Sequence, residues 1–130
     1  MRIGIDAKWY FVGPPSGRRV VRALADTLLR DFPEHEYFVF LNRRQRKEPF
    51  PLSGKNIHRV YVWAGNNMLS NLFVVPGYAT RLKLDVVLYQ NFVSLFGSSK
   101  RVAYIHDVLF LSNPEFYTLY ERLYFSPLRF

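Results

Sequence analysis

The sequence contains no cysteine among its 130 residues. Disulfide bonds and zinc sites built from thiolates are therefore excluded. The three histidines, His35, His58 and His106, show none of the spacings of metal ligands, so we expect no metal site. The sequence also lacks the run of about 18 to 20 apolar residues that a membrane-spanning helix needs. One apolar run, residues 72–75, stops at Pro76 after four residues.

The N-terminal segment also lacks the apolar core of a secretory signal, because Asp6 interrupts it. We therefore expect a cytoplasmic protein. Acidic residues are scarce, with 10 Asp and Glu against 18 Lys and Arg, and the net charge is +8. Such a charge attracts nucleic acid, an anionic bilayer or phosphorylated substrates, and does not choose among them.

What the sequence does contain is typical of one globular domain. Hydrophobic residues make up 49% and charged residues 22% of the chain, far from the profile of a disordered protein. A chain of this length buries about two-thirds of its unfolded surface, which is enough for one core. Aromatic residues reach 18%, so rings either fill that core or serve a partner surface.

Five short apolar runs predict β-strands, because they are rich in β-branched and aromatic residues and are bounded by turn residues. The runs are residues 2–7, 36–41, 57–63, 85–89 and 101–105. The last two are almost continuously apolar, which is typical of strands covered on both faces of a parallel sheet.

Helices are expected between these strands. Apolar residues recur every four positions after Arg18, which predicts a helix that ends before Pro33 and has Arg22 and Asp26 on its outer face. Residues 66–83 predict a second helix, interrupted at Pro76, and Asn113 with the following proline predicts the start of a last one. Alternation of this kind predicts an α/β fold with an open parallel Rossmann-like sheet of about five strands and helices on both faces.

Ligands of open parallel sheets bind beyond the carboxyl ends of the strands. This rule selects Asp6 and the loop 13–17 after the first strand, Gln90 and Asn91 after the fourth, and His106 and Asp107 after the fifth. A glycine-containing loop before a helix N-terminus favours anions. The loop matches neither a dinucleotide fingerprint nor a nucleoside-triphosphate loop, and a simple turn is an equally good interpretation.

Several blocks, in this order, resemble the N-terminal part of glycosyltransferase family 4. They are MRIGIDA at 1–7, GPPSG at 13–17, PEHEY at 33–37, DVV at 85–87 before NF at 91–92, IHDV at 105–108 and NPEF at 113–116. The resemblance covers nearly the whole chain. It departs from the family after Gly17, where Arg18 and Arg19 stand in place of a second glycine.

The resemblance implies a GT-B enzyme that needs no metal or cofactor and transfers a sugar, with retention of configuration, from a nucleoside-diphosphate sugar. It implies that residues 1–130 form the single acceptor-side domain and that a donor-binding domain is missing, so the chain alone is expected to be inactive. His106 is the expected catalytic residue, which orients a sugar hydroxyl, although a capping or core histidine is the alternative. The expected substrate-binding residues are Gly13, Ser16, Gly17, Arg18, Asn91 and Asp107.

The expected partners are the sugar donor and a glycan or lipid-linked acceptor, without nucleic acid. Four of the five residues at 43–47 are basic; a solvated loop is the plain interpretation, and peripheral attachment to an anionic membrane is the alternative. The aromatic series from Phe116 to Phe125 is expected in a helix core, or as exposed surface through which the chain dimerises. The rival interpretation of the whole chain is a basic α/β module that binds nucleic acid or an anionic membrane without catalysis.

Overall fold

The computed structural model describes residues 1–106 and 109–125. All five expected strands are present, and no strand end differs from the expectation by more than one residue. The strands are β1 (Arg2–Asp6), β2 (Glu36–Asn42), β3 (Ile57–Val62), β4 (Val86–Gln90) and β5 (Lys100–Tyr104). The helices are α1 (Pro15–Asp31), α2 (Asn67–Leu69), α3 (Val75–Arg81), α4 (Leu109–Ser112) and α5 (Leu119–Phe125), with short 3-10 or π turns η1 (Arg43–Gln45), η2 (Ser70–Val74) and η3 (Pro114–Phe116).

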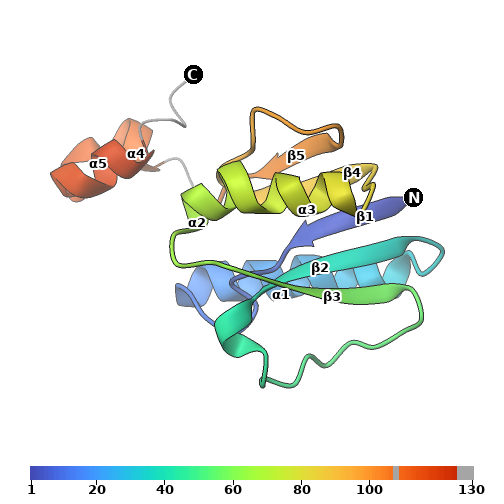
Figure 1. The fold of residues 1–130 in the computed structure, drawn as a ribbon. Helices are drawn as coiled ribbons and strands as arrows, with labels where there is room; N and C mark the ends of the chain where they lie inside the picture. The colour runs from blue at the N-terminus through green and yellow to red at the C-terminus, as the bar shows by residue number, and fades with distance from the viewer. Residues whose placement is uncertain (107–108, 126–130) are drawn as a thin grey trace.

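The strands form one parallel sheet in the order β3-β2-β1-β4-β5, as expected for the fold class (Figure 1). From β1 the chain moves outward through β2 and β3, and it then returns to the other side of β1 for β4 and β5. The direction therefore reverses between β1 and β4, which is where open α/β sheets form their ligand crevices. The carboxyl ends of β1 and β4 meet at this point.

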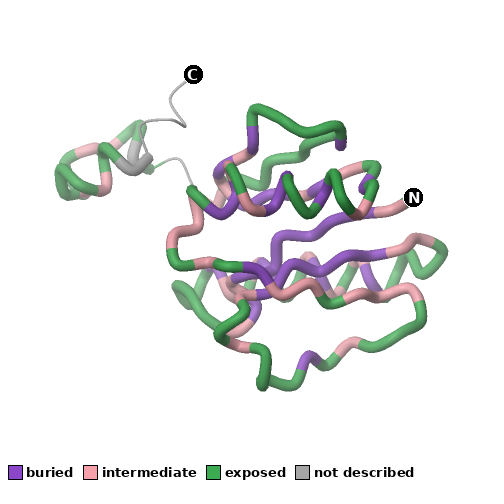
Figure 2. The backbone as a smooth tube through the Cα atoms, in the orientation of Figure 1, coloured by how far each residue is buried: buried purple, intermediate pink, exposed green. Residues whose placement is uncertain are grey.

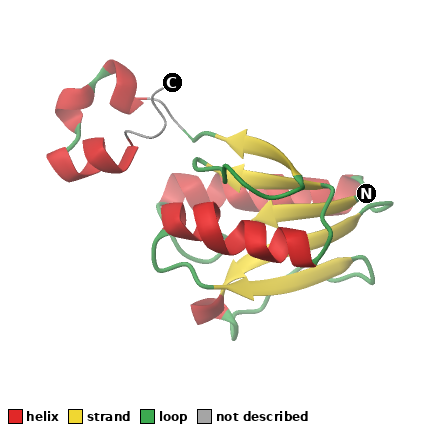
Figure 3. Ribbon diagram, turned by 45° about the horizontal axis from the view of Figure 1, so that its top comes forward, coloured by secondary structure: helices red, strands yellow, loops and turns green. Residues whose placement is uncertain are grey.

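Helices cover both faces of the central strands (Figure 3). On one face, the buried residues Val21, Ala25 and Leu29 of α1 pack on Ile5 and Val39. On the other face, a second core contains Phe38, Phe40, Val75, Ala79, Val87 and Tyr89. Burial of each large apolar side chain contributes about 1.5 to 3 kcal/mol to stability. The buried tube in Figure 2 accordingly runs through β1 and β2.

The first helix begins earlier than expected, at Pro15 rather than near Arg18. Proline suits the first turn of a helix, because its fixed φ is helical and its missing N–H would have no partner there. Arg22 is exposed and Asp26 is half-buried on the outer face, as expected. The Tyr10 hydroxyl donates to Asp26 over 2.9 Å, and Arg22 Nε donates to the Tyr10 carbonyl over 2.7 Å. These two residues thus attach the β1–α1 loop to the helix.

The expected interruption at Pro76 does not occur, and α2, η2 and α3 follow one another without a break. The turn before the proline is a π turn, closed by the Val75 amide donating to the Ser70 carbonyl. Proline removes the donor that residue 76 would offer to the Leu72 carbonyl. The Ser94 hydroxyl lies 3.1 Å from that carbonyl and 2.9 Å from the Phe96 carbonyl, and can donate its single hydrogen to either one.

Two further expectations are wrong. All five residues of β5 are exposed, because a loop without a helix, residues 91–99, joins β4 to β5 and leaves the faces of β5 uncovered in the described structure. The single last helix expected from Asn113 is instead η3 followed by α5, and α4 precedes both. Of the aromatic series, Phe116 and Tyr120 are each 72% exposed, which fits the exposed alternative and not the helix core. No helix in residues 1–106 and 109–125 is both long and apolar enough for a transmembrane span.

Candidate functional site

A buried ion pair lies at the carboxyl end of β1. Lys8 Nζ is 2.6 Å from Asp6 Oδ1, and the two side chains are 1% and 0% exposed. Lys8 N also donates to Oδ1 over 3.3 Å. Burial lowers the pKa of Lys8, and the Asp6 carboxylate opposes that shift. Since Lys8 has no access to solvent, it cannot act on a ligand directly.

Two amides from distant parts of the chain complete this cluster. Asn71, in the π turn η2, accepts from Lys8 Nζ over 2.6 Å and donates to Asp6 Oδ2 over 2.9 Å. Its amide also donates to the Gln90 carbonyl over 3.0 Å. Gln90, the last residue of β4, donates from Nε2 to the Asp6 carbonyl over 2.6 Å. The cluster therefore joins β1, η2 and β4 at the reversal point of the sheet.

His106 is attached to this cluster. Its Nε2 lies 3.1 Å from Gln90 Oε1, and its backbone amide donates to Asn91 Oδ1 over 3.1 Å. Asn91 has a φ of 59°, a left-handed conformation that asparagine tolerates better than most residues. Unlike Lys8, His106 is only half-buried. His106 is therefore a solvent-accessible imidazole that is attached, through Gln90, to the buried Asp6–Lys8 ion pair.

Trp9 connects His106 to the glycine segment. The rings of Trp9 and His106 are 5.2 Å apart between centroids. A Cβ atom added at Gly13 would lie 2.9 Å from Trp9 Cγ, and one added at Gly17 would lie 2.7 Å from Trp9 Cε3. Gly13 also has a φ of 121°, which strongly favours glycine. The structure therefore gives both glycines a role in accommodating Trp9.

The residues expected at the site are found along this edge. Ser16 is exposed on the first turn of α1, and the Arg18 amide donates to the Pro14 carbonyl over 2.9 Å. Arg18 Nε is buried and makes no hydrogen bond within the described part of the chain. Asn91 and His106 are in direct contact. Asp107 lies outside the described residues.

Sequence reasoning missed Lys8, Trp9 and Asn71, and it selected Gln90 only by its position. The sequence around β1 offered a partial signal, since Asp6 ends a buried strand and Lys8 follows it. Nothing near Asn71 in the sequence marks it, because its partner Asp6 is 65 residues away. Tyr104, whose ring lies 5.1 Å from His106, was assigned to a covered strand and not to the site.

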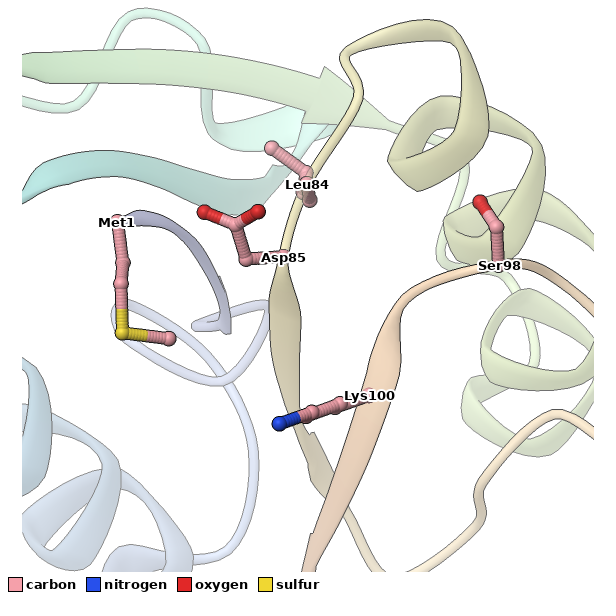
Figure 4. A pocket seen from close by; sticks show the side chains of 5 residues that line it. All are labelled: Met1, Leu84, Asp85, Ser98 and Lys100. Carbon is pink, nitrogen blue, oxygen red and sulfur yellow. The ribbon is translucent and has the colours of Figure 1, made fainter.

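Two hollows in the described part of the chain lie away from this edge. One of about 420 Å³ is at the amino ends of β1, β4 and β5, lined by Met1, Leu84, Asp85, Ser98 and Lys100 (Figure 4). Another of about 330 Å³ lies on α3, lined by Val74, Gly77, Tyr78 and Arg81. Neither contains a residue of the Asp6–His106 cluster.

The described residues contain no group of three or more His, Cys, Asp or Glu side chains arranged to hold a metal ion. Comparisons with protein-family models, with curated proteins and with solved structures found no match to the chain.

Proposed function

We propose that the chain is the acceptor-side domain of a retaining glycosyltransferase that uses a nucleoside-diphosphate sugar. One observation supports this most: Trp9 contacts both the Gly13–Gly17 segment and His106, so these lie together at the carboxyl edge. That edge is the reversal point between β1 and β4, where ligands of such sheets bind.

The proposed roles follow from exposure. The N-terminus of α1 carries partial positive charge and favours an anion. Because Trp9 occupies the space beside Gly17, the diphosphate would meet the exposed Ser16 and the partly exposed Arg18 instead. These groups would stabilise negative charge on the leaving diphosphate. His106 would orient a hydroxyl of the transferred sugar.

In this proposal a second domain holds most of the donor, and the acceptor is a glycan or a lipid-linked sugar. The isolated chain then folds and binds a donor sugar weakly but does not transfer it. Turnover of a nucleotide sugar by the 130 residues at an ordinary enzymatic rate, about 1 per second or faster, would contradict the proposed division between two domains.

Binding can be tested by NMR on the isotope-labelled chain with UDP-glucose, GDP-mannose and ADP-glucose at millimolar concentration. We expect one of them to shift the Trp9 indole and the amides of Ser16 and Gly17. The variant His106→Ala should weaken binding about tenfold, the effect of one lost hydrogen bond. His58→Ala is the matched control, because His58 is bonded to Glu36 on β2, away from this edge. Shifts confined to other surfaces would refute the site.

A basic binding module without catalysis is the second candidate, and one observation favours it. Arg43, Arg44, Arg46 and Lys47 are all exposed, directly after the carboxyl end of β2. Four basic residues near an anionic bilayer contribute about 1 kcal/mol each to attachment. This surface would equally hold a sugar transferase next to a lipid-linked acceptor.

A further inference from the structure

The orientation of the Gln90 amide is fixed by its neighbours. One end of the amide lies 2.6 Å from the Asp6 carbonyl oxygen. A carbonyl oxygen only accepts hydrogen bonds, so the atom facing it must be the NH₂ group. The reverse orientation would place two acceptor oxygens in contact inside the protein. Gln90 therefore presents Oε1 at its other end, toward His106.

The tautomer of His106 follows from this orientation. Gln90 Oε1 is an acceptor and lies 3.1 Å from His106 Nε2, so Nε2 must carry the hydrogen that is donated. A neutral imidazole has one donor and one acceptor. Its acceptor in the neutral ring is then Nδ1.

The surrounding cluster keeps Gln90 in place. The Asn71 amide donates to the backbone carbonyl of Gln90 over 3.0 Å and to Asp6 Oδ2 over 2.9 Å. The Gln90 backbone amide lies 3.4 Å from the same Asp6 oxygen. The Asn71 amide has no alternative orientation either, because its oxygen accepts from the Lys8 ammonium over 2.6 Å. The orientations of the Asn71 and Gln90 amides are thus each determined by a group that can only donate, the Lys8 ammonium, or only accept, the Asp6 carbonyl.

We infer that Gln90 is a positioning residue that holds neutral His106 as the Nε2–H tautomer, with Nδ1 as its acceptor, and that Asp6, Lys8 and Asn71 hold Gln90. The bearing of this inference on sugar transfer rests on the proposed function, whereas the tautomer itself does not. In sugar transfer, a hydroxyl that donates to neutral His106 would have to approach the Nδ1 edge of the ring.

The test is the nitrogen NMR spectrum of the wild-type chain labelled with ¹⁵N-histidine, recorded about two pH units above the ordinary histidine pKa of about 6.5. The spectrum of His106→Asn identifies the signals of His106. We expect a protonated Nε2 and an unprotonated Nδ1. A dominant Nδ1–H form, or a ring averaged between both tautomers, overturns the inference whatever the chain does with sugars.

Two variants test the cause. Gln90→Met keeps the length of the side chain but offers no comparable acceptor, and it should reduce the ratio of Nε2–H to Nδ1–H about tenfold, the effect of one hydrogen bond. Gln45→Met, on the basic turn η1, is the matched control and should leave the ratio unchanged. An unchanged ratio in folded Gln90→Met contradicts the positioning role. If that variant does not fold, the wild-type spectrum still decides the tautomer.

Discussion

Asp6 and Lys8 form an ion pair that is closed to water. Removing one partner of such a pair leaves an uncompensated buried charge, which costs about 3 to 5 kcal/mol. We therefore expect Asp6→Asn to lower the free energy of unfolding by about that amount. Urea denaturation followed by circular dichroism measures the change.

The exposed pair Arg30–Asp31, with side chains 69% and 46% exposed, provides the control. Asp31→Asn should leave the urea midpoint almost unchanged, because solvent screens exposed pairs. The double variant Asp6→Asn with Lys8→Met should recover part of the lost stability, since no unpaired charge remains. Equal midpoints for the two single variants would argue against a buried pair.

Two buried tyrosines predict a loss of stability in alkali. Burial, together with the hydrogen bond to Asp26, raises the pKa of Tyr10 to about 12, and burial raises the pKa of Tyr89 to about 12, from 10.0. Between pH 10 and about pH 12, Tyr10 and Tyr89 lose their protons in the unfolded chain but keep them in the folded chain. The contribution of these two phenols to stability is therefore complete below pH 10 and is lost as the pH rises toward 12.

Tyrosinate absorbance at 295 nm measures this directly. We expect a late phase in the folded protein that loses amplitude in Tyr10→Phe and in Tyr89→Phe. In concentrated guanidinium chloride, all tyrosines should titrate together near the ordinary pKa of about 10. A single phase near that pH in the folded wild type would show that these two phenols are not protected.

Residues of the site differ in how far the sequence predicts them. Asp6, Asn91 and His106 follow from one rule, since each lies at or just beyond the carboxyl end of a recognisable strand. The burial of Lys8 does not, because lysine is almost never buried without partners; Asp6 is close in the sequence, but the second partner, Asn71, is 63 positions away. Local patterns carry no information about a contact of that range.

At the scale of the element, the first turns of α1 and α3 offer a matched pair of glycines, Gly17 and Gly77. A Cβ at Gly17 would meet Trp9 Cε3 at 2.7 Å, whereas a Cβ at Gly77 meets nothing within 4 Å. Gly17→Ala should destabilise the protein by about 1 to 3 kcal/mol through overpacking. Gly77→Ala should stabilise it by about 0.5 to 1 kcal/mol, because alanine favours a helix.

Urea denaturation gives both free energies, and the NMR signal of the Trp9 indole reports whether the ring moves. We expect that signal to shift in Gly17→Ala and to stay in place in Gly77→Ala. A Gly17→Ala variant with wild-type stability and an unmoved indole would mean that Trp9 does not pack against α1.

The strands were more predictable than the helix boundaries. Runs of β-branched and aromatic residues specify a strand locally, and all five expected runs form strands. The start of α1 was placed too late, because Pro15 was assigned to a loop although proline fits a first helical turn. Pro76 was assigned as a break, yet the π turn before it and the Ser94 hydroxyl accommodate it. β5 is exposed because no helix lies between β4 and β5 in the described part of the chain. The pattern of residues within a strand does not indicate whether a helix covers that strand.

At the scale of the whole molecule, the fold class could be predicted because alternating strands and helices restrict a chain to few topologies. The partner that the surface charge attracts could not be predicted, since a net charge of +8 suits several anionic partners. The structure separates these charges in space. Arg43 and Arg44 follow the carboxyl end of β2, whereas Arg30 and Arg81 lie in the last turns of α1 and α3.

This separation allows a test of membrane attachment. Replacing both Arg43 and Arg44 with alanine should weaken binding to vesicles rich in phosphatidylserine about 30-fold, since each basic residue contributes about 1 kcal/mol. Replacing Arg30 and Arg81 removes the same charge and should have a smaller effect. Vesicle sedimentation at low and at physiological salt measures both, because salt screens this attraction.

Equal losses in the two double variants would mean that net charge, and not the basic turn, governs attachment. Tight binding of both variants to DNA with a steep dependence on salt would instead favour the nucleic-acid module.

The hydrogen bond from Gln90 to the Asp6 carbonyl joins residues 84 positions apart, and this separation has a consequence for the order of folding. While the chain is being synthesised, β1 and β2 are available long before β4 leaves the ribosome. Until then Asp6 and Lys8 remain hydrated, and one edge of β1 stays open. Because Asn71 and Gln90 supply the replacement hydrogen bonds, we expect the charges to lose their water only when β4 docks, and this docking to be the step that closes the interior.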